Sequence, residues 1–346
     1  MKKFFLLLIL VGTLGCGKTP EQKATDTISR ANFLLTTRQC QEAINILEAL
    51  GRQTSNPNYI VTLASAYACK AGYSSTTFFA QDISKITSDN STFGGTAAMT
   101  TSDDAVTPSF YTDTKVTSLL TAINILLYAG GAIDSAEEPT YAKRLEIYGN
   151  DGGDINSFAM YLILAHLGKF YHYFGDASVN LADVANPATK AGGALAGTCM
   201  TSYTNAEAIL AAADVDTYLS AANTGSCDSV SGSVIRAEIN DSATNRRALL
   251  CQAIVGFNNL FELLPLVLAD AAGTDLSTIS GVTASITAVK TALTTDFTNG
   301  GAGAADQAAL AATIVVQSQE TCETSTTINL RSLEAYFLLL VESTFK

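Results

Sequence analysis

The sequence predicts an all-α protein, and three observations support this fold class. Apolar residues recur at steps of three and four along most of the chain, as they do on one face of a helix. Residues that start and end helices flank these runs, and the alternation typical of strands is absent. We therefore expect helical hairpins near the N-terminus, followed by a larger irregular helical bundle or solenoid with long Ser/Thr/Gly loops.

The first 16 residues have the order of a secretory signal peptide. Lys2 and Lys3 precede an apolar run over residues 4–11, and a stretch of mostly small residues then leads to Cys16. The run is too short to cross a bilayer, which takes about 20 apolar residues. An uncleaved anchoring helix is the alternative, and export is the interpretation that the pattern favours.

The end of this segment, Leu14-Gly15-Cys16, resembles the lipobox of bacterial lipoproteins. That family usually has Leu three residues before the cysteine, whereas here Thr13 holds that place and Leu14 follows it. The resemblance implies that residues 1–15 are removed and that Cys16 carries palmitate-type acyl chains, which stabilise membrane binding by about 0.8 kcal/mol per buried CH₂. Gly17 stands where an Asp favours retention in the inner membrane, so the resemblance implies an outer-membrane anchor facing the periplasm or the cell surface.

The composition favours a packed domain with few charges. Hydrophobic residues make up 47% and charged residues 15% of the chain, so a sizeable core can form. The net charge of −12 becomes −14 when residues 1–15, which include Lys2 and Lys3 and no acidic residue, are removed. Such an acidic chain repels phosphate backbones, so we expect no nucleic acid partner, and membrane contact only through the lipid. No cofactor is expected.

Six cysteines remain when Cys16 is set aside, and an oxidising compartment favours disulfides between them. Ordinary buried thiols are the alternative for some of them. None has CxxC spacing, so we expect neither a redox nor a zinc role. The simplest pairing joins neighbours along the chain, as Cys40–Cys69, Cys199–Cys227 and Cys251–Cys322.

Residues 27–88 are expected to form helical hairpins after a polar tether over residues 16–26. The first periodic run ends at Gly51, a residue type that commonly terminates helices. Asn56-Pro57 then starts the next run as N-cap and first helical residue, and Gly72 ends it.

Both runs resemble tetratricopeptide (TPR) repeats, in which paired helices pack closely through small residues. Ala43 and Ala64 would let the helices approach, while Leu47 and Tyr67 fill the space between them. The resemblance implies a TPR-like stack with a concave surface for a protein partner. It rests on Ala31, Leu34, Cys40, Ala43, Leu47 and Leu50 in the first run, and on Ile60, Leu63, Ala64, Tyr67 and Gly72-Tyr73 in the second.

Residues 112–346 are expected to form the larger α-helical domain, after a Ser/Thr/Gly-rich loop over residues 89–111. A helix capped by Asp154 or Asn156 is apolar almost all round, so we expect it to be buried. Pro265 is expected to kink or end another helix. The predicted helices are residues 112–128, 157–174, 205–222, 244–268, 276–297, 308–319 and 330–345.

The residues that could carry chemistry form no specific catalytic pattern. His166 and His172 are six residues apart and so lie on different faces of a helix, unlike a zinc pair at four-residue spacing. We interpret His166 as a buried, hydrogen-bonded side chain, and the aromatic run 170–174 as core rather than the lining of a ligand pocket. Residues 150–156 combine oxygen ligands with glycines but lack the Glu of a calcium loop, so we interpret them as a loop with a helix cap and expect no metal.

These features favour a lipid-anchored envelope protein that is not an enzyme and acts as a helical-repeat scaffold for other envelope proteins, in assembly, secretion or a pilus-type system. Tyr67, Tyr171 and Tyr173 are the candidate binding residues. One alternative is a solute-capturing lipoprotein similar to the TPR-like subunit of certain TRAP transporters, with residues 170–174 at the site. The other alternative is an envelope hydrolase, and only the presence of acidic residues favours it, such as Glu207, Asp214 and Glu262.

Overall fold

The computed structural model describes residues 18–82, 84, 99, 110, 112–174, 177–179, 188–190, 243–272, short pieces between 284 and 295, and 303–337. Only the backbone is described for residues 171–174, 177–179, 188–190, 243–245 and 270–272. The all-α prediction is confirmed for this part of the chain, which contains one short pair of strands besides its helices.

The described elements follow one another as a series of helices. A π-helical turn, η1 (Phe78–Asp82), follows α5, and a 3-10 turn, η3 (Ala129–Gly131), follows α7. Strands β1 (Ala177–Val179) and β2 (Ala188–Lys190) pair antiparallel after α9. The helices are α2 (Pro20–Thr36), α3 (Cys40–Leu50), α4 (Pro57–Lys70), α5 (Ser75–Thr77), α7 (Thr114–Leu127), α8 (Tyr141–Tyr148), α9 (Asp151–Phe174), α13 (Ala243–Ala272), α15 (Ala304–Thr313), α16 (Gln319–Thr324) and α17 (Leu330–Tyr336).

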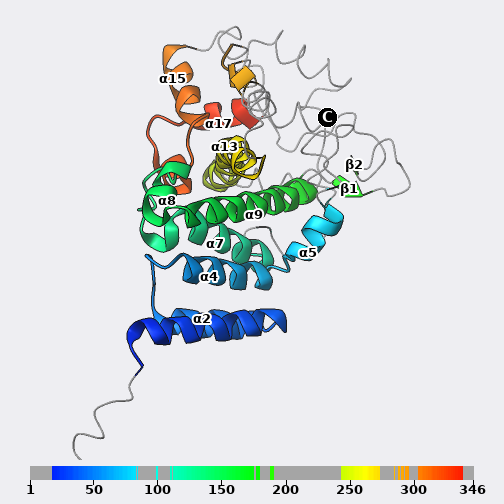
Figure 1. The fold of residues 1–346 in the computed structure, drawn as a ribbon. Coiled ribbons are helices and arrows are strands. Elements are labelled where there is room, and N and C mark those ends of the chain that lie inside the picture. The colour runs from blue at the N-terminus through cyan, green and yellow to red at the C-terminus, as the bar shows by residue number, and fades with distance from the viewer. Residues whose placement is uncertain are drawn as a thin grey trace, which may run out of the picture.

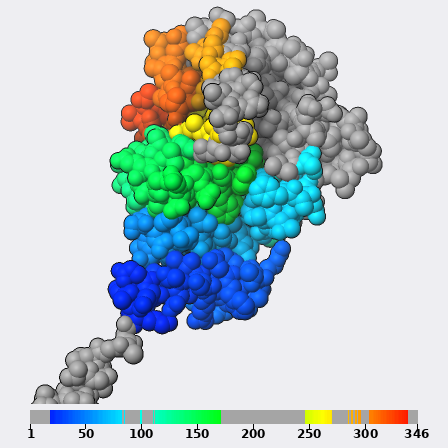
Figure 2. Space-filling view, viewed as in Figure 1, coloured from blue at the N-terminus to red at the C-terminus, as the bar shows by residue number. Residues whose placement is uncertain are grey.

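The helices form successive layers in the order in which they occur along the chain. Figure 1 shows α2, α4, α7, α9 and α13 one above another, and each of them packs against the next. The short helix α3 packs against both α2 and α4, while α16 and α17 pack against α13. In Figure 2 the same progression is visible as bands of colour from blue to orange. Each layer therefore packs mainly on the described layers before and after it along the chain.

One hydrophobic core runs through these layers. It includes Leu47 and Leu63 from the N-terminal hairpins, and also Leu119, Ile163 and Phe257 from the region beyond the predicted loop at residues 89–111. The helices α4 and α7 lie side by side across that boundary. The two regions that the sequence separates into hairpins and a larger helical part thus share a core.

Helix α2 begins earlier than the sequence predicts. The expected tether extends to residue 26, but the helix starts at Pro20. The Thr19 hydroxyl accepts a hydrogen bond from the Gln22 backbone N–H, and the Gln22 side chain accepts one from the Thr19 N–H, which makes a capping box. Pro20 suits the first helical position because its fixed φ is helical and its missing N–H needs no partner there. Apolar periodicity misses this start because the first turn is exposed and polar.

The turn after α7 depends on glycine. Gly130 has a φ of 65°, in the left-handed region that favours glycine. A Cβ at this position would also overlap the Cδ1 atom of Ile60 on α4. The helix predicted to end at residue 128 thus ends at Leu127, just before this turn, and the turn has a second role in the close approach of α4 and α7.

Helices α8 and α9 meet at another glycine. The periodicity does not predict α8, and α9 begins at Asp151, so the interpretation of residues 150–156 as a loop is wrong for all but the first of them. A Cβ on Gly152 would lie 3.0 Å from the carbonyl oxygen of Arg144 and 2.9 Å from Cδ2 of Leu145. Glycine weakens a helix, but here it allows the close packing of α8 on α9 that stabilises both.

The long helix α13 continues through Pro265, so an end of the helix at this proline is wrong. Leu263 and Val267 are buried on either side of the proline, and their packing keeps the chain in its helical course. By length and composition the segment Arg246–Ala269 could cross a membrane, but 67% of its most apolar window is buried inside the protein. Because it packs against α9, α16 and α17, its environment is that of a core helix.

The C-terminal helices differ in their bounds from the prediction as far as the structure describes them. The expected helix 308–319 is divided into α15 and α16, which a turn over residues 314–318 separates. Asn329 starts α17 through a capping box with Ser332. The predicted helices 205–222 and most of 276–297 lie outside the described residues.

Two of the three predicted disulfides lie within the described residues, and both are present. Cys40–Cys69 joins the start of α3 to the end of α4 with a Cα–Cα distance of 5.6 Å. Cys251–Cys322 joins α13 to α16 with a Cα–Cα distance of 5.8 Å. Each bridge therefore connects helices that already pack against each other. Cys199 and Cys227 lie outside the described residues.

Candidate functional site

A small cavity lies between α7, α9 and α13, and the segment that leads into α16 closes it. Its volume is about 110 Å³. The described lining residues combine apolar side chains with carboxamides and a single imidazole, and none of them is Asp, Glu, Lys or Arg. Asn124 is the one described lining residue that is exposed, so it marks the rim of the cavity.

Helical periodicity brings these residues together. Positions that are three, four and seven residues apart share one face of a helix. α7 and α13 each contribute four residues at this spacing, and α9 contributes two, one turn apart. The members are Leu120, Ile123, Asn124 and Leu127 of α7, Ile163 and His166 of α9, Gln252, Val255, Gly256 and Asn259 of α13, and beyond the helices Tyr128 and Gln317, with Gln319 at the first position of α16.

His166 is the most perturbed titratable group at the cavity. Its side chain is 2% exposed, and both ring nitrogens lack a hydrogen-bond partner. Burial, and to a lesser degree the charge of Lys169 one turn further along α9, lower the pKa of His166 to about 3. The imidazole is therefore neutral at neutral pH, with one N–H donor and one nitrogen acceptor. The prediction that His166 is buried is confirmed, and the prediction that it is hydrogen-bonded is wrong.

Two carboxamides add unpartnered acceptors. The Asn259 Nδ2 group donates to the carbonyl oxygens of Val255 at 2.8 Å and Gln317 at 2.9 Å. Because both partners are acceptors, the amide orientation is determined, and Asn259 Oδ1 is left buried without a partner. Gln252 Oε1 is also buried and unpartnered. A buried polar atom without a partner costs about 1–3 kcal/mol, so this cluster lowers the stability of the fold.

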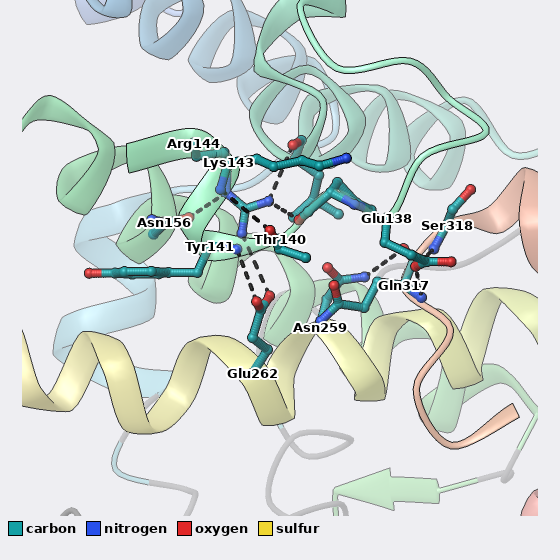
Figure 3. Close-up of polar contacts among 12 residues, drawn as sticks. Glu138, Thr140, Tyr141, Lys143, Arg144, Asn156, Asn259, Glu262, Gln317 and Ser318 are labelled. Atoms are coloured by element: carbon teal, nitrogen blue, oxygen red, sulfur yellow. Dashed lines mark hydrogen bonds and ion pairs between the residues drawn. The ribbon is translucent and has the colours of Figure 1, made fainter. Parts of the chain in front are cut away.

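A polar network holds the part of the cavity wall that Gln317 forms (Figure 3). The Glu138 carboxylate accepts hydrogen bonds from the backbone N–H groups of Gln317 and Ser318, the latter at 2.9 Å. The Asn259 side chain holds the Gln317 carbonyl group from the opposite side. The wall of the cavity is thus attached both to α13 and to the loop before α8.

Arg144 is fully buried and lies in the same network (Figure 3). Its guanidinium donates to backbone carbonyl oxygens, that of Leu127 at 3.2 Å among them, and to the Asn156 side chain. Glu262 Oε2 lies 4.0 Å from Arg144 Nη2, and Glu262 Oε1 accepts from the Tyr141 N–H at 3.0 Å. Burial lowers the pKa of Arg144 to about 10 and raises the pKa of Glu262. Glu262, one of the hydrolase candidates, thus joins α13 to α8.

Of the three candidate binding tyrosines, Tyr67 has a described side chain, and it does not line the cavity. Tyr67 is partly buried between α3 and α4, and its hydroxyl donates to Glu48 Oε1 at 3.3 Å. Burial and the nearby Glu48 carboxylate raise the pKa of this phenol. Tyr171 and Tyr173 belong to α9, but their side chains lie outside the described residues, as do those of His172 and the rest of the aromatic run after Phe170.

Three further predicted site residues, Cys16, Glu207 and Asp214, lie outside the described part of the chain. Within that part, no group of three or more His, Cys, Asp and Glu side chains is arranged to hold a metal ion.

The sequence contains a signal for the cavity that apolar periodicity overlooks. Gln252 and Asn259 are seven residues apart, so they share a face of α13 with Val255 and Gly256. A face turned to a core is normally apolar, and buried polar residues are the informative exceptions. Two amides at helical spacing within an apolar stripe therefore mark this site, and His166 could be assigned to it only from the packing of α9 on α13.

Comparisons with known proteins return no relative. No family model, no curated protein and no solved structure matches the chain.

Proposed function

We propose that this chain is a lipid-anchored protein of the bacterial envelope whose helical domain captures a small solute in the cavity beside His166. The observation that carries the proposal is the set of buried, unpartnered polar atoms on His166, Gln252 and Asn259, all from residues that line one cavity. Buried polar groups in folded proteins are nearly always hydrogen-bonded. Convergent polar groups on an otherwise apolar cavity are typical of ligand sites.

The proposed address rests on the N-terminal segment. Cys16 after a short apolar run resembles a lipidation site, and cleavage there would leave a short link of three residues, 17–19, before α2. The disulfides Cys40–Cys69 and Cys251–Cys322 support export, because disulfides persist in oxidising compartments and are rare in the cytosol. A tethered binding domain would hold its solute close to the membrane, where a transport partner could receive it.

Binding rather than catalysis is proposed because of what surrounds His166. A general base or nucleophile acts together with a partner that orients or activates it. The described lining of the cavity offers amides, a phenol and apolar groups beside the imidazole, and no carboxylate, thiol or aliphatic hydroxyl. These groups are suited to hydrogen bonding with a bound molecule.

Native mass spectrometry of the full chain tests solute capture. The protein is extracted from its own membranes in mild detergent, and its mass is compared before and after denaturation. We expect a small molecule that is released on denaturation, and its loss in the variant Gln252→Leu. An unliganded native mass for protein extracted in this way, together with no binding from a solute library, would contradict the proposal.

Intact-mass analysis of the same sample tests the address. We expect the mass of a chain that begins at Cys16 and carries acyl chains, and a shift to the aqueous fraction for the variant Cys16→Ser. Retention of Met1 without an acyl adduct would show that the proposed anchor is wrong, and would leave solute capture to be judged on its own test.

Protein docking on the N-terminal helices is a second candidate function. Phe33 on α2 is 66% exposed, the most of any large apolar side chain that the structure describes, and α2 forms the outer layer at one end of the stack (Figure 1). A photo-crosslinking residue placed at position 33 in living cells should capture an envelope protein if this face is a docking site. The same residue at Ile147, another exposed apolar position, serves as the control. Equal labelling at both positions would count against docking.

A further inference from the structure

The chemistry of the cavity lining restricts the kind of solute it can hold. Hydrogen-bonding capacity comes first. With the Asn259 amide nitrogen already committed to two carbonyl oxygens, the free groups are Asn259 Oδ1, Gln252 Oε1 and the two nitrogens of His166. A neutral imidazole supplies one donor and one acceptor. The unpartnered set therefore contains three acceptors and one donor, and a complementary ligand must be rich in O–H or N–H donors.

Charge is the second restriction. None of the described lining residues carries a formal charge that could compensate a charged ligand. An anion would face three acceptors, which repel it. A cation would lie near Lys169, whose buried charge already disfavours the protonated form of His166. A buried charge without a counter-charge is strongly unfavourable, so the site favours an uncharged ligand.

Size is the third restriction. The cavity volume of about 110 Å³ is somewhat smaller than an apolar cavity of about 150 Å³ that holds one benzene molecule. A ligand of about four to six non-hydrogen atoms would fill such a space. The apolar part of the lining, with Leu120 and Ile123 from α7 and Val255 from α13, suits a short carbon skeleton between the hydroxyl groups.

We propose that the cavity beside His166 binds a small uncharged hydroxyl compound, of the diol or polyol class, through the free acceptors of His166, Gln252 and Asn259. This inference rests on the proposed solute capture and names the chemical class of the solute. The hydroxyl groups of a triol can donate to the two amide oxygens and to the unprotonated imidazole nitrogen. Those of a diol can donate to two of these three acceptors, and in either case one ligand oxygen accepts from the imidazole N–H.

Four probes of matched size separate this class from the others: propane-1,2-diol, propanoate, 1-aminopropan-2-ol and methyl acetate. They represent a neutral donor, an anion, a cation and a molecule with acceptors only. Binding to the full-length protein is followed by the shifts of the His166 imidazole nitrogens in NMR spectra. We expect the diol to bind at least tenfold more tightly than each of the other three.

Variants connect this binding to the named groups. His166→Phe and Gln252→Leu should each weaken diol binding at least tenfold. Binding to these variants is measured by equilibrium dialysis, because His166→Phe removes the imidazole that the NMR experiment observes. Tyr148→Phe alters a buried hydroxyl away from the cavity and should bind the diol as the unaltered chain does. Gln252 is only partly buried, so its variant keeps the test decisive if His166→Phe does not fold.

The outcomes distinguish this inference from solute capture itself. Tightest binding by propanoate, by 1-aminopropan-2-ol or by methyl acetate, abolished in the same variants, would overturn the hydroxyl class and leave solute capture standing. Absence of binding by all four probes would overturn the hydroxyl class, while solute capture would still be decided by native mass spectrometry.

Discussion

The hydroxyl oxygen of Tyr148 lies 2.6 Å from the carbonyl oxygen of Thr54, and so joins the end of α8 to the loop between α3 and α4. The same hydroxyl lies 3.1 Å from the Ala129 carbonyl oxygen in η3. Burial raises the pKa of Tyr148 to about 12, so the phenol stays a donor at every physiological pH. One side chain thus connects the N-terminal hairpins to the helices that carry the cavity.

The variant Tyr148→Phe should therefore destabilise the whole described core. It removes a donor and leaves carbonyl oxygens in a largely buried site, for which we expect a loss of about 1–2 kcal/mol in the free energy of unfolding. Urea denaturation followed by circular dichroism measures this loss. The transition should stay single, because both regions share one core. Two separate transitions would contradict the shared core.

Two glycines with positive φ differ in what a side chain would meet. Gly130 (φ 65°, ψ 15°) lies in the left-handed region, and a Cβ there would overlap Ile60. Gly130→Ala should cost about 1 kcal/mol for the left-handed alanine and roughly 1–3 kcal/mol more for overpacking. Gly149 (φ 57°, ψ −131°) has open space around it but a backbone that residues with a Cβ rarely adopt, so Gly149→Ala should cost about 1–3 kcal/mol from strain alone. A loss of only about 1 kcal/mol for Gly130→Ala in urea denaturation would show that α4 and α7 do not approach as closely as described.

Removal of the Cys251–Cys322 bridge should lower stability substantially. The bridge closes a loop with a sequence separation of 71 residues. Chain entropy predicts a contribution of about 4 kcal/mol for a loop of this length, and about 3.5 kcal/mol for the separation of 29 residues at Cys40–Cys69. Paired serine substitutions and thermal melts measure both. A double variant Cys251→Ser/Cys322→Ser that melts like the unaltered chain would argue against this bridge in the native protein.

The buried imidazole of His166 should make stability depend on pH. Its pKa is about 3 in the folded protein and 6.5 in the unfolded chain, so the unfolded chain binds the proton first as the pH falls. The stability that the neutral form provides is complete above pH 6.5 and decreases between pH 6.5 and 3, by at most about 1.4 kcal/mol per pH unit.

Urea midpoints measured between pH 7.5 and 5 test this dependence, since most carboxylates remain ionised in that range. We expect the decrease in the unaltered chain and in His172→Gln, which keeps His166, and a smaller decrease in His166→Phe. If the pH dependence disappears in His172→Gln instead, His172 and not His166 causes it, and the prediction is wrong.

Substitution of Arg144 tests the network around the cavity wall. Arg144→Met leaves the Leu127 carbonyl oxygen and Glu262 without their guanidinium partner, and we expect a loss of about 3–5 kcal/mol. Arg30→Met removes an exposed ion pair to Glu42, for which we expect a loss below about 1 kcal/mol. Chemical denaturation of the two variants gives the comparison. Similar losses would mean that the buried network contributes little to stability.

The sequence by itself determined where most helices lie. Local signals were sufficient for this, because a helix end depends on a few neighbouring residues, as Asn56-Pro57 and Gly51 show for α4 and α3. The apolar stripe of α9 likewise indicated a buried helix, and neighbour pairing identified the two disulfides that the structure describes.

Only the tertiary structure decided which polar residues meet. Local pattern missed α8, placed the start of α9 at residue 157 instead of Asp151 and gave His166 a hydrogen bond that it lacks. The cavity unites residues of α7, α9 and α13 that are more than a hundred positions apart in sequence, such as Leu120 and Asn259. Periodicity specifies which face of a helix is turned inward, but the partner across that face depends on how the helices pack, which no local stretch of sequence encodes.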